Sequence, residues 1–236
     1  MGKAMFREHF SEFFGVFGLV YFGGWAVLMA TAGKMDMLGV AMVHSAVLGL
    51  FIWLGCSFAG CHFNPALTIG FLATNEISAS KAVTYIVAQL VGTYTAALSL
   101  KYTAPEALLE SARKAGADYG GPHQSNEFSW FAASLLELIG TFMLMFTVKT
   151  LCAENQARRF APLIGSVVGL CIMCFGSFTG TGVNPFRYLG PALVALKLGD
   201  FYIYMIPPII GACLASYAFN SMLNFDKEEI LAEELQ

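Results

Sequence analysis

Charged residues are scarce in this sequence: Asp, Glu, Lys and Arg make up 12% of its 236 residues, whereas an average soluble domain has about 25%. Hydrophobic residues account for 57%, and mean hydropathy is +0.64. This composition is incompatible with an ordinary soluble domain and predicts an integral membrane protein. The net charge of only −3, spread over both halves, also argues against a nucleic-acid partner.

Signals of processing and of metal binding are missing as well. No basic segment precedes a short apolar stretch with a small-residue cleavage site, so the first span is expected to act as its own insertion signal. The cysteines lie in or beside apolar runs and show neither a disulfide framework nor metal-ligand spacing. They are Cys56, Cys61, Cys152, Cys171, Cys174 and Cys213. We therefore expect no metal and no cofactor.

The uncharged runs predict an all-α membrane protein with six transmembrane helices and two re-entrant half-helices. Four runs suit a single crossing, which takes about 20 residues. They are residues 13–33, 82–100, 130–148 and 201–225. Two other runs, 37–75 and 160–186, are too long for one crossing and contain an Asn-Pro pair. Each long run is therefore interpreted as a full span followed by a loop that enters the membrane and returns as a half-length helix.

The two halves of the chain repeat one another. Glu12 matches Glu137 at an offset of 125 residues, each opening a Glu-x-x-Gly motif, and Asn64 matches Asn184 at an offset of 120. Because each half has three full spans, the second must be inserted upside down, which gives an inverted repeat. The expected boundaries within one channel domain, 1–236, are repeat 1 at 8–103, a connecting loop at 104–128, repeat 2 at 129–222 and an acidic cytoplasmic tail at 223–236.

Each Asn-Pro pair predicts a helix start inside the membrane. Pro65 and Pro185 suit the first helical turn, where the missing N–H would have no partner. Each start directs unpaired N–H groups and about half a positive charge back at its own asparagine. The amides of Asn64 and Asn184 can then donate to a passing water oxygen, and a water held by two donors does not readily relay a proton. The alternative is that the asparagines only cap the helices.

Several motifs together carry a resemblance to a known family. They are Asn64-Pro65-Ala66, Asn184-Pro185-Phe186-Arg187 followed by Gly190-Pro191, Ala88 to Gly92, and the two Glu-x-x-Gly motifs. These resemble the aquaporin, or major intrinsic protein, family over roughly residues 8–222. The resemblance implies a passive channel for water and small neutral solutes, a homotetramer in the lipid bilayer, and cytoplasmic termini in a plasma or vacuole-like membrane. Phe186 departs from the usual alanine and is expected to pack where the half-helices meet.

The resemblance also implies a constriction built from four residues. They are His44, Ile172, Thr181 and Arg187. An unpaired arginine in the apolar region costs about 2.5–3.5 kcal/mol on insertion scales, so Arg187 is expected to face water. The set resembles that of plant vacuolar-membrane aquaporins and of ammonia-permeable relatives, although those usually have Gly or Ala at the position of Thr181. An alternative interpretation of His44 is a histidine satisfied between helices.

Supporting roles are expected for several other residues. Glu12 and Glu137 are expected to accept backbone N–H groups from the inserted loops, and His62 is expected to brace its loop. Cys61, the symmetry mate of Thr181, is expected to reach the pore and to be its mercurial-sensitive thiol, with the other five cysteines inside spans. His123 is either a surface residue or a partner of Arg187. Lys and Arg residues, Lys149 among them, are slightly more numerous on the expected cytoplasmic side.

Other functions remain open at this point. A glycerol or small-polyol facilitator of the same family is the nearest alternative. A secondary transporter also uses inverted repeats but needs coupling groups near the membrane midplane, and only Glu12 and Glu137 are available, at span starts. A largely structural membrane protein is a third possibility. An enzyme is the least favoured, because no nucleophile–base pair or metal cluster accompanies the expected cavity.

Overall fold

The computed structural model describes residues 2–58 and 61–234, with side chains described for 5–58 and 61–222. These residues form helices and loops, with no strand among them. The helices are α1 (Gly2–Thr31), α2 (Met37–Gly55), α3 (Pro65–Ala73), α4 (Ala79–Thr103), α5 (Glu106–Lys114), the short 3₁₀ turn η1 (Asp118–Gly120), α6 (Trp130–Ala153), α7 (Ala161–Thr179), α8 (Pro185–Ala195) and α9 (Phe201–Glu234). Within the described residues, six helices are long and apolar enough to cross a membrane: α1, α2, α4, α6, α7 and α9.

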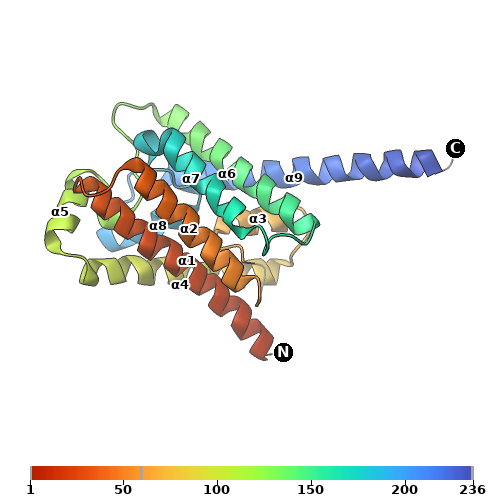
Figure 1. The fold of residues 1–236 in the computed structure, drawn as a ribbon, viewed down its shortest axis with the longest axis horizontal. Helices are drawn as coiled ribbons and strands as arrows, with labels where there is room; N and C mark the ends of the chain where they lie inside the picture. Colours follow the sequence, from red (N-terminus) through yellow and green to blue (C-terminus); the bar gives the residue numbers. More distant parts are fainter. Residues whose placement is uncertain (1, 59–60, 235–236) are drawn as a thin grey trace.

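The two over-long runs divide as the sequence predicts. The run 37–75 contains the spanning helix α2 and the half-helix α3, and the run 160–186 contains α7 and the start of α8. Both half-helices begin at a proline that directly follows an asparagine N-cap. They lie among the spanning helices (Figure 1). The predicted all-α architecture is confirmed, although α1 begins earlier and α6 and α9 end later than the uncharged runs suggested.

The helix pairs α1–α4 and α6–α9 come close enough for backbone contact. A Cβ atom on Gly92 of α4 would lie 2.4 Å from the carbonyl oxygen of Phe13, and one on Gly211 of α9 would lie 2.2 Å from that of Leu138. Small residues allow such approach in membranes, where packing rather than the hydrophobic effect drives helix association. In both repeats, a glycine thus allows two helix backbones to approach each other.

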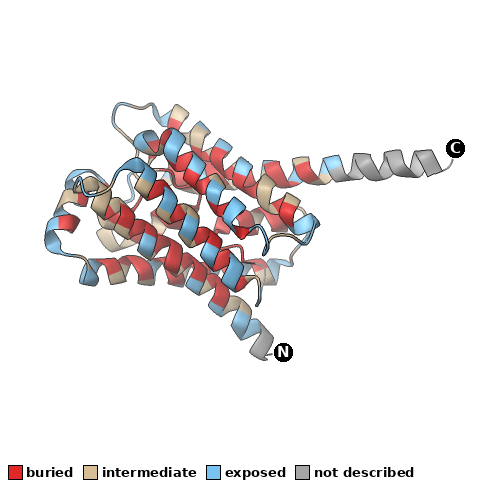
Figure 2. Ribbon diagram, in the orientation of Figure 1, coloured by how far each residue is buried: buried red, intermediate tan, exposed pale blue. Residues whose placement is uncertain are grey.

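Buried residues face inward and exposed ones outward (Figure 2). The exposed side chains of the spans include large apolar ones such as Leu50, Ile139 and Ile210. An apolar outer surface on long helices is what contact with lipid hydrocarbon requires. For the predicted acidic tail, 223–236, the backbone of α9 continues to Glu234, and its side chains lie outside the described residues.

The connecting loop 104–128 contains structure that the sequence analysis treated only as a polar connection. Helix α5 lies there and packs Leu108, Leu109 and Ala112 against Leu28 of α1 and Leu100 of α4. Its other face is charged, as expected of a helix that covers the bundle at the water interface. The packing fixes the loop that continues through η1 toward the centre of the molecule.

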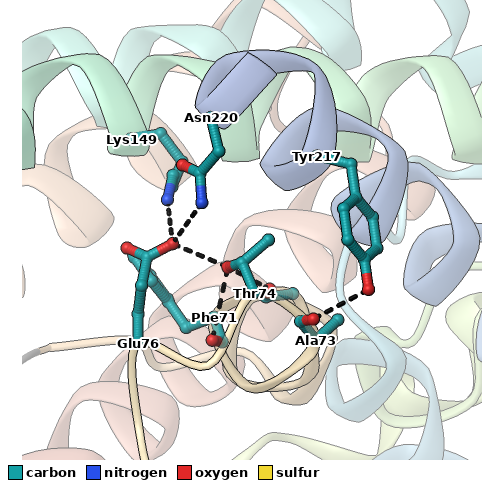
Figure 3. Close-up of polar contacts among 8 residues, drawn as sticks. Phe71, Ala73, Thr74, Glu76, Lys149, Tyr217 and Asn220 are labelled. Carbon is teal, nitrogen blue, oxygen red and sulfur yellow. Dashed lines mark hydrogen bonds and ion pairs between the residues drawn. The ribbon is translucent and has the colours of Figure 1, made fainter. Parts of the chain in front are cut away.

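A polar cluster ties the end of α3 to α6 and α9 (Figure 3). Lys149 of α6, counted above among the charges of the expected cytoplasmic side, is buried at 3% exposure and paired with Glu76, just beyond α3. The same carboxylate accepts hydrogen bonds from Asn220 of α9 at 3.2 Å and from Thr74 at 2.6 Å. The ammonium of Lys149 also lies 5.4 Å from the ring of Phe71. The cluster therefore holds the C-terminal end of α3 in place.

Replacing Glu76 with glutamine is expected to destabilise the protein. The change leaves the Lys149 ammonium buried without its counter-charge, which costs about 3–5 kcal/mol in a fully buried pair. Because Glu76 is 36% exposed, water compensates for part of this cost. We expect the free energy of unfolding to fall by about 1–3 kcal/mol, measured by thermal unfolding of the detergent-solubilised protein. Glu110→Gln, in the exposed pair with Lys114, is the control and should change stability little. Equal losses in the two variants would contradict a special role for the cluster.

The pH dependence of this contribution follows from the pKa of Glu76. Burial alone would raise that pKa, but hydrogen bonds from Lys149, Thr74 and Asn220 outweigh it and lower the pKa below its ordinary value of 4.5. A carboxylate with a lowered folded-state pKa stabilises the fold above its ordinary pKa. This contribution is lost as pH falls through the lowered value. The stability difference between wild type and Glu76→Gln should therefore shrink on acidification below about pH 4.5.

Candidate functional site

The loops that precede α3 and α8 have matching, unusual backbones. Cys61 and Phe63 have φ angles of 46° and 49°, and their mates 120 residues on, Thr181 and Val183, have 50° and 40°. Residues other than glycine seldom adopt this left-handed region, so the surrounding structure must hold it in place. The repeat seen in the sequence therefore extends to individual backbone angles.

The carboxylate of Glu12 holds the first loop. It accepts the backbone N–H of His62 at 2.7 Å and that of Phe63 at 2.8 Å. A third hydrogen bond comes from the side-chain amide of Gln89 in α4, at 2.7 Å. Glu12 is fully buried, so these three donors replace the water that a carboxylate otherwise requires.

The carboxylate of Glu137 holds the second loop in the same way. It accepts the backbone N–H of Gly182 at 2.9 Å and that of Val183 at 2.6 Å. One turn later, a Cβ atom on Gly140 would lie 2.7 Å from a methyl carbon of Val183. The first repeat is equivalent, because a Cβ on Gly15 would lie 2.3 Å from the ring of Phe63. In each Glu-x-x-Gly motif, the glutamate binds the loop backbone and the glycine leaves room for a loop side chain.

The two asparagines join the loops to each other. The Nδ2 of Asn64 donates to the carbonyl of Val183, and that of Asn184 donates to the carbonyl of Phe63, both at 2.8 Å. Each Oδ1 accepts the backbone N–H two residues on, as a helix N-cap does. One amide hydrogen of each asparagine thus binds the opposite loop, and the second is left for a solute.

A narrow cavity of about 40 Å³ runs between these groups. It is lined by both asparagines and by His44, Thr181 and Arg187, together with apolar side chains such as Leu19, Val168 and Leu144. At roughly 10–15 Å³ per water molecule, it has room for about three waters. A small space with a few polar groups on a largely apolar wall suits a short file of water molecules.

Arg187 lies in this cavity almost completely buried, at 2% exposure. Its Nη1 donates to the carbonyl of Gly120 at 2.7 Å and its Nε to the Nε2 of His44 at 3.2 Å. A guanidinium has five N–H donors. In the described part of the chain two of them are used, so the remaining donors are available to a solute. The positive charge stays in the cavity because two neutral acceptors orient it without neutralising it.

His44 is both a packed histidine and a cavity residue. Because the Nε of Arg187 can only donate, the Nε2 of His44 must accept, and the ring proton then resides on Nδ1. That Nδ1 lies 2.9 Å from the carbonyl of Val40, to which it donates. A Cβ on Gly23 would lie 2.5 Å from the Nε2 atom. The imidazole is thus held neutral and fixed. His44 is therefore both a histidine satisfied between helices and a residue of the cavity wall.

Ile172, the remaining residue of the expected constriction, lines a neighbouring cavity. This cavity of about 220 Å³ is also lined by His123, Val40 and Gly121. His123 does not pair with Arg187: the Gly120 carbonyl takes that place, and the Nδ1 of His123 has no partner among the described residues. Sequence reasoning missed Gly120, whose only signal was the concentration of glycine in this part of the connecting loop.

Phe186 lies outside the lining of the 40 Å³ cavity, although it directly follows the second Asn-Pro pair. Its side chain is 5% exposed and belongs to the main apolar core, and its carbonyl accepts a hydrogen bond from Thr93 of α4 at 2.5 Å. The departure from alanine therefore changes the packing behind the loop. Neither Pro65 nor Ala66, both buried, lines the cavity either.

His62 lines the cavity and contacts two side chains of α3. Its Nδ1 lies 3.0 Å from the hydroxyl of Thr68, and its ring stacks on Phe71 with 4.7 Å between centroids. Gln89 reaches the same hydroxyl at 3.1 Å. These contacts connect the first loop, the first half-helix and α4.

The cysteine prediction needs correction. Cys61 lines the cavity, but so do Cys56, at the end of α2, and Cys152, in α6. The expectation that only Cys61 reaches the pore is therefore wrong, because α2 and α6 end beside the loop rather than away from it. Mercurial inhibition that is abolished by Cys61→Ser alone is no longer expected.

Comparisons with known proteins agree on one family. The chain matches the family described as "Major intrinsic protein" over residues 2–219. Nodulin-26 from Glycine max is 32% identical over 222 residues, covering 92% of this chain and 78% of that protein. Aquaporin TIP4-4 from Zea mays is 31% identical, covering 86% of this chain and 82% of that protein. The X-ray structure of the aquaglyceroporin from Plasmodium falciparum aligns with a TM-score of 0.74 at 22% identity, covering 92% and 96% of the two chains, and so shares the fold.

Proposed function

Since this chain belongs to the major intrinsic protein family, and is therefore a channel for small neutral solutes rather than an enzyme, we propose that water is its principal solute. The observation that carries the proposal is the 40 Å³ cavity with Asn64 and Asn184 on its wall. About three waters fill such a space. The outward face of the spans is apolar, so the channel is expected to work in a lipid bilayer. Membership of the family supports a homotetramer with both termini cytoplasmic.

Proton exclusion follows from the donors around this file of waters. A water whose oxygen accepts from the free amide hydrogens of Asn64 and Asn184 points both of its own hydrogens away, which interrupts proton relay in both directions. The N-termini of α3 and α8 add positive potential at the same place. Arg187 adds a full positive charge. Cations and protons are thus repelled electrostatically, while neutral molecules pass.

Water flux through proteoliposomes tests the proposal. Stopped-flow shrinkage should show a permeability above that of empty liposomes, with a low activation energy and no proton leak. The double variant Asn64→Leu, Asn184→Leu is the matched control, and it should lose the water permeability if it folds. Permeability equal to that of empty liposomes for the wild type, in protein shown to be folded, would refute water conduction. Flux that depends on a proton or sodium gradient would indicate a transporter.

A glycerol or small-polyol facilitator is the alternative within the family. The likeness to an aquaglyceroporin supports the shared fold alone. The preference for water rests on the two asparagines, whose free amide hydrogens suit a single water oxygen, because a space for about three waters could also hold one small polyol. Glycerol uptake by the same liposomes, at a rate comparable with that of water, would reverse this preference.

Ammonia is expected as a second solute. Ammonia is close to water in size. Ile172 makes the wall of the neighbouring 220 Å³ cavity apolar at a position where a polar side chain would hold water more tightly. Liposomes that contain the protein should alkalinise faster in an ammonium gradient than liposomes without it. The double variant Ile172→His, His44→Phe should slow this rate and retain water flux. If wild-type ammonia entry equals that of empty liposomes while water flux is high, Thr181 narrows the constriction enough to exclude ammonia.

A further inference from the structure

Two thiols meet beside the loop that carries Asn64. Cys56 caps the C-terminal end of α2, with helical φ and ψ angles of −57° and −11°. The Sγ of Cys61 lies against the last turn of α2, because a Cβ on Gly55 would be only 2.8 Å from it. Because Cys56 directly follows Gly55 and both cysteines line the same cavity, the two thiols lie beside each other at the end of α2, although they belong to different elements.

Both cysteines can be reached from the solute path. Each lines the same cavity as the two asparagines. Cys56 is half-buried and Cys61 is buried, so a reagent in the cavity meets Cys56 more readily. A neutral molecule similar in size to water can reach them through a channel of this kind, whereas a large reagent cannot.

The surroundings of Cys56 favour its thiolate form. The positive charge of Arg158 favours the thiolate of Cys56, whereas burial and the charge of Glu12 oppose it. Arg158 lies near this end of α2, with its guanidinium 5.3 Å from the ring of Trp53. Thiolates next to arginine and partly open to solvent are the reactive cysteines of proteins.

We propose that Cys56 and Cys61 form a reversible disulfide when a hydroperoxide enters the channel. The thiolate of Cys56 attacks one peroxide oxygen, so an S–O bond forms and the O–O bond breaks. The leaving hydroxide takes up the proton that the Cys56 thiol released and becomes water. The sulfur of Cys61 then attacks that of Cys56: an S–S bond forms, the S–O bond breaks, and the departing hydroxide takes the thiol proton of Cys61 and leaves as a second water. Two thiols are oxidised to one disulfide, and one hydrogen peroxide is reduced to two waters.

The disulfide would act on the pore through the loop. Bond formation brings the two sulfur atoms from non-bonded contact to about 2.05 Å. Cys61 precedes His62 and Phe63, whose N–H groups bind Glu12, and Asn64 follows them. Pulling Cys61 toward α2 displaces this chain of contacts, so the oxidised channel is expected to conduct less water. In a reducing cytosol such a disulfide is transient, as in redox sensors.

The chemical part of the proposal can be read directly by mass spectrometry. No Lys or Arg lies between Lys34 and Lys81, so trypsin places Cys56 and Cys61 in one peptide that contains no other cysteine. Full-length protein in liposomes is treated with hydrogen peroxide. We expect this peptide to lose two hydrogen atoms and both alkylation sites together, with full recovery after dithiothreitol. Sulfinic or sulfonic acid at either residue without the cross-link, or a cross-link to Cys152 instead, would overturn the proposal.

The effect on flux rests on the proposed function and is measured in the same liposomes. Water permeability should fall on oxidation and recover on reduction in wild type and in Cys213→Ser, a control that removes a thiol outside the cavity. Cys56→Ser and Cys61→Ser should be insensitive to peroxide. Unchanged permeability in a fully cross-linked wild type would overturn the regulatory part. Absence of water flux in the reduced protein would instead refute the proposed function, while the mass measurement would still decide the disulfide.

Discussion

Replacing Arg187 with valine is expected to raise urea permeability by about tenfold or more and to admit protons. The substitution removes the positive charge from the cavity and widens the space beside Thr181. A tenfold rise corresponds to a fall of about 1.36 kcal/mol in the barrier to urea permeation. Urea uptake and a pH-sensitive dye in proteoliposomes measure the two effects, with water flux recorded alongside.

The fold should survive this change. Valine leaves the carbonyl of Gly120 and the Nε2 of His44 without the donor they now have, at a cost of about 1–3 kcal/mol for each buried group. Water can reach both from the widened cavity and reduce that cost. Arg187→Lys separates the two causes: it retains the charge and so should still exclude protons, while its slimmer head should let more urea through. Wild-type selectivity in a folded Arg187→Val protein would show that the arginine has only a structural role.

Replacing Glu137 with alanine is expected to destabilise the protein severely. Two buried N–H groups, those of Gly182 and Val183, lose a charged acceptor. Hydrogen bonds to charged groups contribute about 1.5–3 kcal/mol each, so the loss is about 3–6 kcal/mol. A typical protein has only about 5–15 kcal/mol of stability in total. The measurement is the yield of monodisperse protein in detergent and its thermal unfolding.

The control for this variant is Glu154→Ala. Glu154 is an exposed residue just beyond the end of α6 and should tolerate alanine. Glu12→Ala should be similarly damaging, because Glu12 also accepts two loop N–H groups and in addition the amide of Gln89. If Glu137→Ala were as stable as Glu154→Ala, the loop would have to be held by its packing against Gly140 rather than by the carboxylate.

The arrangement of spans and half-helices could be predicted from the sequence because it depends on the lengths of the uncharged runs and on the charges that bound them. An uncharged run of residues 37–75 fits neither one crossing nor two, and Asn64-Pro65 marks where the half-helix begins. The offset between Glu12 and Glu137 similarly indicated which carboxylate belongs to which loop. These features depend on local rules for helix starts and on the thickness of a bilayer.

Contacts between distant segments could not be predicted in the same way. The Gly120 carbonyl that binds Arg187 comes from a connecting loop, where a backbone group has no sequence signature of its own. Lys149 resembled a surface charge at a helix end, and only the position of Glu76 after the half-helix makes it a buried partner. Cys56 and Cys152 resembled span residues, since their distance from the cavity depends on where α2 and α6 end.

The exchange of hydrogen bonds between the two asparagine loops has a consequence for biogenesis. Asn64 needs the carbonyl of Val183, and Phe63 supplies the acceptor for Asn184, so neither loop is complete while its partner is still on the ribosome. Translation at about 5–20 residues per second puts roughly 6–24 s between the synthesis of the two loops. During that interval the nascent first half holds a polar amide and a carbonyl at membrane depth with no mate. It must therefore remain beside the insertion machinery, or draw water to the loop, until the second half arrives.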